Sequence, residues 1–371
     1  MKVILVSFLH LDELPPMMTV LKVLSKSYDV LYIGVDDLTS SYRNLFGDRV
    51  KFVNVSTGDL IEGNGFTRKC VRCLQREIRN FKWKSVYSVI EDNYNVGDIL
   101  WIHHEFTLMS LKRLKIPYYL TMYELHPDLF KKKSELKTRI QRASKVIVPE
   151  YTRAAIVKAC AGLHSMPTVI QNKPYEFDKI KTSIEKNPLE EIVANAHALN
   201  KKVILYSGIF LRERKLDTII EATQHLSDKF EIVLLGRESP YLRELLDRYS
   251  NVTYLGFYTP PHHLDVIAKA DIGVLTYVAD TGSINPVFCA PNKIWEYAKY
   301  GIPMICNDIP GLKYTVEYSG FGYCCDENSV DSICAALNQI YDNYDKLSEN
   351  ALKYYETVDI EADILKVMAS D

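Results

Sequence analysis

The stretch from Cys289 to Asp308, CAPNKIWEYAKYGIPMICND, holds a helix start, a helix and a buried strand in direct succession. Pro291 suits the first turn of a helix, where its missing N–H group costs nothing. Gly301 can end the helix and Pro303 prevents it from resuming. The apolar run Met304–Cys306 then predicts a short core strand. Between the two prolines, apolar residues recur at roughly helical spacing: Ile294, Trp295, Ala298 and Tyr300.

The start of this predicted helix is suited to a nucleotide. Free backbone N–H groups and the positive end of the helix dipole lie near Ala290–Lys293, where a phosphate binds well, and Lys293 adds a cation. Glu296 follows Lys293 and Asn292 at a spacing that places all three on one helix face. A carboxylate there repels phosphate but accepts hydrogen bonds from neutral hydroxyls, such as the two of a ribose. A surface helix with a solvated Lys–Glu pair is the alternative, and this stretch alone leaves it open.

The length and composition predict a folded protein of two domains. The chain has 371 residues, of which 47% are hydrophobic and 25% charged, as in globular proteins. No segment reaches the apolar length of a transmembrane helix, and MKVILVSFLH at the N-terminus is predicted to be a core strand rather than a signal peptide. The eight cysteines show no disulfide framework, which predicts a cytoplasmic location. Cys70 and Cys73 form a lone CxxC without the second pair that a zinc site needs.

Both halves of the chain alternate short apolar runs with helical patterns. This alternation predicts parallel sheets covered by helices on both faces, with functional loops beyond the carboxyl ends of the strands. In the first half, residues with polar or titratable side chains fall at such ends: His10, His103, His104, Glu105, Glu124 and His126. In the second half, six strand signals predict a second doubly wound domain. The terminal stretch from Val330 to Ser370 is predicted as one long helix, broken near Asp359.

The predicted domain organisation follows from these patterns. Residues 1–172 form an N-terminal Rossmann-like domain, and residues 173–200, polar and helix-prone, connect it to the next domain. Residues 201–355 form a C-terminal Rossmann-like domain, and residues 356–371 form a helix that crosses back to the first domain. Two such domains are expected to face each other across a cleft, the usual place for a ligand.

Three strand ends of the second domain carry residues suited to a nucleoside diphosphate. Gly208 permits close backbone approach, and three cations follow it, which suit a diphosphate: Arg212, Arg214 and Lys215. The next strand ends at Gly236, followed by Arg237 and Glu238, and the third is followed by Tyr258, placed to border a base. The alternatives are a solvated charge run and, for Tyr258, a turn aromatic that covers the core.

These segments together resemble one protein family. YSGIFLRERKLDTIIEA, LGFYTPPHHLDVIAKADIGVL and PNKIWEYAKYGIPMICNDIPGL resemble, in order, the donor-domain elements of retaining GT-B glycosyltransferases of family 4, the glycosyltransferase group 1 domain. The likeness covers nearly all of Lys201–Ile340. TMYELHP and VIQNKP resemble weaker landmarks of the family's first domain. The resemblance implies the GT-B architecture and retention of the anomeric configuration. It also implies that residues 1–172 are the acceptor-side domain and that residues 201–355 bind a nucleotide-sugar donor.

The resemblance also implies roles for individual residues. It places Arg214 on the diphosphate, Glu296 on the ribose, and Asn292 and Lys293 near the phosphates or the sugar. The family often has a glutamate where this chain has Phe288, a glycine where it has Lys215, and a glycine-rich loop after the first strand, which SFLHLDELPPM lacks. The fold class generally works without a metal, so none is expected. The VDD at Val35–Asp37 lies in the wrong domain for a donor-site metal.

The leading functional prediction is a retaining glycosyltransferase that uses a UDP- or GDP-sugar to build a surface polysaccharide or related glycan on a glycan or lipid-linked acceptor. His126 would position the sugar or acceptor, while Arg214 and Lys215 stabilise the leaving nucleoside diphosphate. The alternatives are a nucleotide-sugar epimerase of the same architecture and a non-catalytic glycosyltransferase-like subunit. The missing acid at Phe288 disfavours the epimerase, and the presence of Arg214 and Glu296 disfavours the subunit.

The net charge of −2 conceals an asymmetry between the halves. Residues 1–172 carry 25 Lys and Arg against 17 Asp and Glu, and the remainder carries 20 against 30. Residues 67–84 are predicted as a basic helix with four arginines on one face, and a second basic helix includes Lys131–Lys133, Lys137, Arg139 and Arg142. A solvated surface is the alternative, and no nucleic-acid motif accompanies the patch. We expect peripheral contact with an anionic membrane, where lipid-linked acceptors reside.

Overall fold

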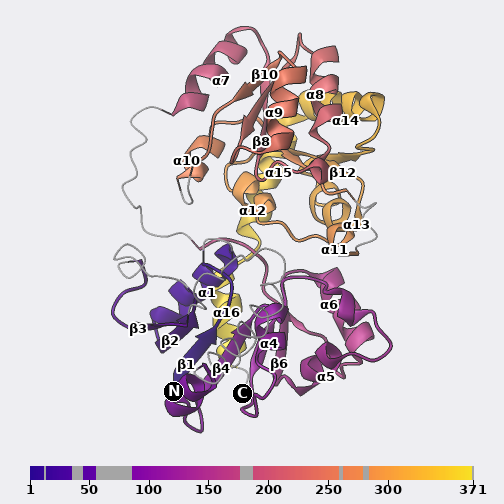
Figure 1. The fold of residues 1–371 in the computed structure, drawn as a ribbon. Helices are drawn as coiled ribbons and strands as arrows, with labels where there is room; N and C mark the ends of the chain where they lie inside the picture. Colours follow the sequence, from indigo (N-terminus) through magenta and orange to yellow (C-terminus); the bar gives the residue numbers. More distant parts are fainter. Residues whose placement is uncertain are drawn as a thin grey trace, which may run out of the picture. The chain divides into compact units, whose positions relative to one another are not determined.

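The computed structural model describes residues 1–11, 14–35, 45–55, 86–175, 187–258, 262–278 and 284–369. The chain divides into two compact units: unit 1 comprises Met1–Gln171 and Ile360–Asp371, and unit 2 comprises Asn172–Asp359. Each unit is built on its own sheet (Figure 1). The predicted basic helix over 67–84, with Cys70 and Cys73, and the two aspartates of the VDD lie outside the described residues.

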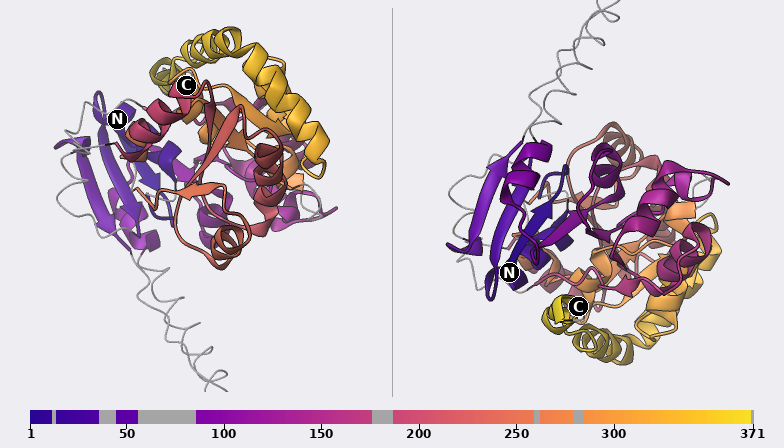
Figure 2. Two further views of the ribbon diagram at one scale, coloured as in Figure 1. Left: turned by 90° about the horizontal axis from the view of Figure 1, so that it is seen from above. Right: turned by 90° about the horizontal axis from the view of Figure 1, so that it is seen from below.

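Unit 1 contains a 7-stranded parallel sheet in the order β3-β2-β1-β4-β5-β6-β7. The strands are β1 (Lys2–Val6), β2 (Asp29–Gly34), β3 (Val50–Asn54), β4 (Ile99–His103), β5 (Tyr119–Thr121), β6 (Lys145–Val148) and β7 (Thr168–Val169). Strands β1, β2 and β3 lie side by side (Figure 2). All five residues of β4 are buried, because helices cover both faces of a parallel sheet.

The helices of unit 1 come from both ends of the chain. They are α1 (Pro15–Ser25), α4 (Glu105–Ser110), α5 (Glu135–Arg142), α6 (Tyr151–Ala161) and α16 (Ile360–Ala369), with the short turn η1 (Pro127–Leu129). Helix α16 lies among the N-terminal elements (Figure 1). Lys26 pairs with Glu361 at 2.6 Å, and Lys145 donates to the carbonyl of Val367 at 2.8 Å. These two contacts, together with buried Ile364 and Val367, fix the terminal helix in unit 1.

Unit 2 contains a 6-stranded parallel sheet in the order β10-β9-β8-β11-β12-β13. The strands are β8 (Lys202–Ser207), β9 (Phe230–Leu235), β10 (Val252–Tyr254), β11 (Ile272–Leu275), β12 (Met304–Asn307) and β13 (Gly322–Cys325). In both units the sheet grows first to one side of its first strand and then to the other. The strand order therefore reverses between β1 and β4 in unit 1 and between β8 and β11 in unit 2, where doubly wound sheets bind ligands.

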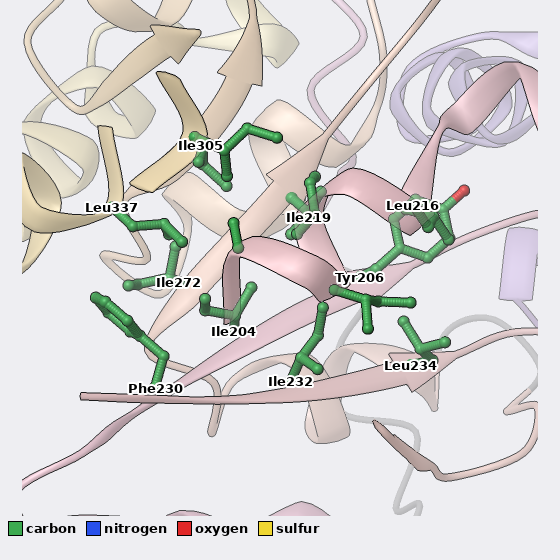
Figure 3. Packing of buried hydrophobic residues seen from close by; sticks show 14 of the residues in the cluster. Ile204, Tyr206, Leu216, Ile219, Phe230, Ile232, Leu234, Ile272, Ile305 and Leu337 are labelled. Carbon is green, nitrogen blue, oxygen red and sulfur yellow. The ribbon is translucent and has the colours of Figure 1, made fainter. Parts of the chain in front are cut away.

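Helices cover both faces of the unit 2 sheet and bury two apolar cores. One core joins β8, β9 and β11 to α8 (Leu216–His225), α9 (Pro240–Arg248) and α14 (Val330–Asp342). Figure 3 shows Ile204, Ile232 and Phe230 of the sheet facing Ile219 and Leu337 of the helices. The opposite core includes α7 (Pro188–Ala198), α10 (His263–Ile267), α12 (Lys293–Ala298) and α15 (Tyr344–Glu356). Shorter turns complete the described part of the unit: η2 (Arg212–Arg214), α11 (Ile284–Val287), α13 (Pro310–Leu312) and η3 (Lys313–Glu317).

Three local predictions differ from the structure. The range 173–200, predicted as a connection, includes α7, which packs in unit 2 because its Leu189 and Ala196 are fully buried. The stretch from Val330 is three helices rather than one helix with a single break, since the chain also turns at Asn343. Helix α12 begins at Lys293 rather than at Pro291, because the Pro291 carbonyl is taken in a tight turn by the N–H of Ile294.

The strand ends of β8 and β9 approach each other closely at two glycines. A Cβ atom on Gly236 would lie 2.0 Å from the carbonyl oxygen of Gly208 and 2.9 Å from the ring of Phe210. Real Cβ atoms do not approach backbone oxygen so closely, so only glycine fits there. Gly256 differs, because it has a φ of +79° but open space where its Cβ would lie.

Substituting these glycines should therefore have unequal effects. Gly236→Ala must move backbone, and we expect it to lower the free energy of unfolding by about 3 kcal/mol or more. Gly256→Ala should cost only the backbone strain of a positive φ, about 1–2 kcal/mol. Urea unfolding followed by circular dichroism gives both values. Equal losses in the two variants would show that the close approach at Gly236 does not constrain the fold.

Candidate functional site

The candidate site of unit 2 lies along the carboxyl edge of its sheet. Gly208 follows β8, Gly236 follows β9, Thr276 follows β11, and Asn307 ends β12. The Asn307 side chain accepts from the N–H of Tyr277 at 2.9 Å and donates to its carbonyl at 2.8 Å. The parallel topology thus brings segments that are distant in sequence to one edge, next to the point where strand order reverses.

Arg214 is fixed across this reversal point. Its Nη1 donates to the carbonyl of Thr276 at 3.2 Å, and its own carbonyl accepts from the Thr276 hydroxyl at 2.6 Å. The guanidinium lies over the ring of Tyr277, 4.0 Å from the ring centre. This cation is therefore preorganised beside the ends of β8 and β11, since a stacked, hydrogen-bonded guanidinium loses little freedom on binding an anion.

The other predicted cations of this turn are directed elsewhere. Arg212 pairs with Glu244 of α9, and the Lys215 ammonium donates to the side chain of Asn328. Lys215 has a φ of 43°, in the left-handed region that favours glycine. The predicted set of three cations is thus not gathered at one point, and it is Arg214 that bonds to Thr276 at the end of β11.

The predicted residues after β9 and β10 form pairs among themselves. The guanidinium of Arg237 stacks on the exposed ring of Phe257 at 4.4 Å, and Glu238 pairs with Arg243 at 3.2 Å. Tyr258 is partly buried and packs against the core of α10 and α12. These residues lie near the carboxyl edge of the sheet. Within the described residues, no hydrogen bond or ion pair joins them to Arg214 or Glu296.

Glu296 is a buried carboxylate with two cationic or donor partners. It is 8% exposed, and its Oε2 lies 2.5 Å from the Lys293 Nζ and 3.3 Å from the His263 Nε2. Burial by itself raises the pKa of Glu296, but Lys293 and His263 outweigh it and lower that pKa to about 2. Glu296 is therefore ionised at neutral pH. No hydrogen bond to its second oxygen, Oε1, occurs within the described chain.

The segment before α12 is hydrogen-bonded to Asn172, the first residue of unit 2. Asn172 donates from its side chain to the carbonyl of Ala290 at 2.8 Å, while its Oδ1 is buried without a partner in the described chain. Asn292 precedes α12 but makes no side-chain capping bond. Asn172 belongs to the VIQNKP motif, so one residue of this motif bonds to the segment that precedes α12.

His263 is a site residue that the sequence analysis missed. It opens α10, which packs against α12 in the second core of unit 2. The histidine pair in TPPHHL was visible. However, no spacing in the sequence indicates that α10 contacts α12, so the partner of His263 could not be identified.

Unit 1 gathers the predicted polar residues at the ends of β4 and β5. The His103 Nδ1 lies 2.9 Å from the Tyr123 hydroxyl, and the His104 Nε2 lies 3.5 Å from the Glu105 Oε1. Burial lowers the pKa of His103 to about 3. Burial, followed by the charge of His126, lowers that of His104 to about 4. Both imidazoles are therefore neutral at pH 7. The His103 Nε2 and the Glu105 Oε2 are buried without a partner in the described chain.

Two histidines of this cluster have their tautomers fixed by the backbone. The Nδ1 of His104 accepts from the N–H of Phe106, and the Nδ1 of His126 accepts from the N–H of Asp128, each at 3.1 Å. Because Nδ1 is an acceptor, a neutral ring carries its proton on Nε2. His126 thus presents an N–H donor. Glu124, predicted at the same edge, is exposed and lies 3.9 Å from Arg153.

The comparisons with known proteins agree with this architecture. Residues 201–343 match the family described as Glycosyl transferases group 1. Among solved structures, Anabaena HepE in complex with UDP is 15% identical, with 100% of each chain covered and a TM-score of 0.69. Sucrose-phosphate synthase from Thermosynechococcus elongatus is 16% identical, covering 99% of this chain and 97% of that one, with a TM-score of 0.66. WaaG, a glycosyltransferase involved in lipopolysaccharide biosynthesis, is 13% identical with a TM-score of 0.59, and each chain is fully covered at 100%.

These likenesses establish the fold. The chain consists of two parallel-sheet, Rossmann-like domains and has the GT-B fold, as predicted. No curated protein matches the chain. In the part of the chain that the structure describes, no helix has the length and apolar character needed to span a membrane.

The buried acid of unit 1 predicts a pH dependence of stability. Burial raises the pKa of Glu105 from 4.5 to about 8, so the folded state keeps a proton that the unfolded chain loses above pH 4.5. The contribution of Glu105 to the free energy of unfolding is therefore fully present below pH 4.5, and it is lost as the pH rises to about 8.

We expect Glu105→Gln, which stays neutral, to gain stability relative to the wild type over this window, by an amount on the order of a few kcal/mol at about 1.4 kcal/mol per pKa unit. Urea unfolding midpoints from pH 5 to 9 measure it, with the exposed Glu91→Gln as control. A difference between Glu105→Gln and wild type that does not vary with pH would contradict a neutral buried Glu105.

Proposed function

We propose that the protein is a retaining glycosyltransferase that transfers a sugar from a UDP- or GDP-sugar to a glycan or lipid-linked acceptor in the synthesis of a surface polysaccharide or glycoconjugate. The observation that carries the proposal is the presence of one fixed cation, Arg214, and one fixed anion, Glu296, in a unit whose sequence matches Glycosyl transferases group 1. Arg214 is held by Thr276, and Glu296 is held by Lys293 and His263. HepE, a structural neighbour, has been solved with UDP and with UDP-glucose.

The two charges match the two ends of a nucleoside diphosphate. A guanidinium grips phosphate oxygens with two parallel N–H groups, so Arg214 serves the diphosphate. An ionised carboxylate accepts only, so Glu296 suits the ribose hydroxyls and not the phosphates. Since Lys293 and His263 occupy its Oε2, Oε1 is the atom offered to the ribose.

Transfer with retention places the acceptor on the face from which the nucleoside diphosphate leaves, and a leaving phosphate oxygen takes the acceptor proton. Negative charge develops on that oxygen, so Arg214 stabilises the transition state more than the ground state. Lys215 contributes only if its ammonium leaves Asn328. His126 donates from Nε2 to the sugar or the acceptor, because its Nδ1 is already occupied by the backbone.

Metal independence is part of the same proposal. Arg214 and Lys293 supply the positive charge that a divalent cation would otherwise bring to the diphosphate. The assay of transfer from UDP-glucose or a GDP-sugar is therefore run with and without EDTA, and full loss of turnover in EDTA, restored by magnesium, would count against this part.

The role of Arg214 is tested by comparing two arginines of one turn. Arg214→Ala should weaken binding of UDP or GDP about 10- to 100-fold, which corresponds to loss of a charged hydrogen bond of about 1.5–3 kcal/mol. Arg212→Ala removes the same charge but breaks only a surface pair with Glu244, and should leave affinity nearly unchanged. Calorimetric titration measures both. Equal loss of affinity in the two variants would show that the diphosphate is bound by the whole turn. Unchanged affinity in both would show that Arg214 does not bind the diphosphate.

Peripheral contact of unit 1 with an anionic membrane is also proposed. Around the start of α5, Lys132, Lys133 and Lys137 line a surface hollow of about 510 Å³, and Phe130 beside them is 41% exposed. Arg139, predicted to belong to this basic face, is instead buried and donates to the carbonyls of Leu108 and Leu111. The two exposed lysines, Lys132 and Lys133, therefore carry the proposal.

We expect the double variant Lys132→Glu/Lys133→Glu to reduce sedimentation with anionic vesicles, because each lysine near such a surface contributes about 1 kcal/mol. The exposed pair Lys112→Glu/Lys115→Glu changes the net charge of unit 1 equally and should have a smaller effect. Equal binding of all forms to neutral and anionic vesicles would show that these lysines are solvated surface residues that do not bind the membrane.

A further inference from the structure

His263, at the start of α10, contacts the carboxylate of Glu296, which belongs to a different helix, α12. His263 and Glu296 belong to different elements, and their Nε2 and Oε2 atoms are 3.3 Å apart. An ionised carboxylate can only accept, so the Nε2 of His263 carries the proton and donates it. The imidazole side chain is 14% exposed. Its Nδ1 is buried and has no partner within the described chain, so Glu296 is the acceptor toward which this ring is turned.

The two partners of Glu296 have different consequences. Lys293 lies one turn before Glu296 on α12, and its ammonium sits on a flexible stem that follows the carboxylate as it rotates. His263 reaches Glu296 from α10 on a short, rigid side chain. Lys293 therefore supplies charge, whereas His263 fixes which oxygen faces α10 and which is left for a ligand.

We propose that His263 is a positioning residue that orients the Glu296 carboxylate toward the ribose of the donor and so sets the preference of the site for a nucleotide with ribose hydroxyls. This inference rests on the proposed function, because it assigns the ribose to Glu296. His263 does not touch the donor. It acts through Glu296, whose Oε1 accepts from the ribose hydroxyls when Oε2 is held by His263.

The test compares two ligands that differ only in the groups that Glu296 would contact. The probes are UDP and its 2′,3′-dideoxy analogue, with GDP and its dideoxy analogue in parallel, titrated by calorimetry. The wild type should bind the ribonucleotide about tenfold more tightly or better, as expected for hydroxyls bonded to a charged group. In His263→Phe, which fills the space but cannot donate, this preference should fall severalfold while affinity for the dideoxy analogue is retained.

Two further variants separate positioning from a general structural role. His263→Gln places an N–H donor at a similar reach and should restore most of the preference. His262→Phe alters the neighbouring histidine, which makes no capping bond at the start of α10, and should match the wild type. Melting temperatures of all variants establish that each is folded, because only the ratio of the two affinities reports orientation.

The possible outcomes are distinct. An unchanged preference in a folded His263→Phe, or an equal loss for both ligands that His263→Gln fails to rescue, would overturn the positioning role while leaving the proposed donor site intact. Failure of the wild type to bind either UDP or GDP would instead overturn the proposed function itself.

Discussion

The buried carboxylate of Glu296 and its two partners are the interaction on which the candidate site depends. A charge that is removed from water is costly unless it is paired and hydrogen-bonded. Here a lysine on the same helix and a histidine on another helix both converge on one oxygen, and they lower the pKa of the acid to about 2 against the opposing effect of burial. A buried anion of this kind is hard to explain as packing, because an apolar residue would fill the same space at lower cost. It is readily explained as a preorganised acceptor.

The sheet supplies the rest of the site by topology. In unit 2 the chain crosses from β9 and β10 to β11 on the other side of β8, so the turns that follow β8 and β11 are adjacent although some 60 residues separate Arg214 from Thr276. The tight contact between Gly208 and Gly236 brings the ends of β8 and β9 together in the same way. Unit 1 has the same strand order with one further strand, β7, at its edge, and its buried, neutral cluster of His103, His104 and Glu105 lies at the ends of β4 and β5.

The sequence predicted the fold well because periodicity and strand-end chemistry are local signals. Both parallel sheets, the stop at Gly301 and a strand over Met304–Cys306 could be predicted from short runs of residues, and the observed strand β12 is one residue longer. The site was harder to predict from the sequence, because its geometry depends on contacts between helices and strands that are distant in the sequence. The three cations after β8 look equivalent in sequence, yet Arg212 is drawn to Glu244 and Lys215 to Asn328, which leaves Arg214 at the end of β11. Similarly, the basic pattern of α5 gave no sign that Arg139 would turn inward to backbone carbonyls.

The central claim, that the carboxyl edge of unit 2 binds a nucleoside diphosphate through Arg214 and Glu296, is tested most directly by a crystal structure of the protein soaked with UDP. The account predicts phosphate oxygens against the Arg214 guanidinium and a ribose hydroxyl within about 3 Å of the Glu296 Oε1, with His263 still on Oε2. UDP bound with its ribose away from Glu296, or bound elsewhere than at the ends of β8 and β11, would contradict it.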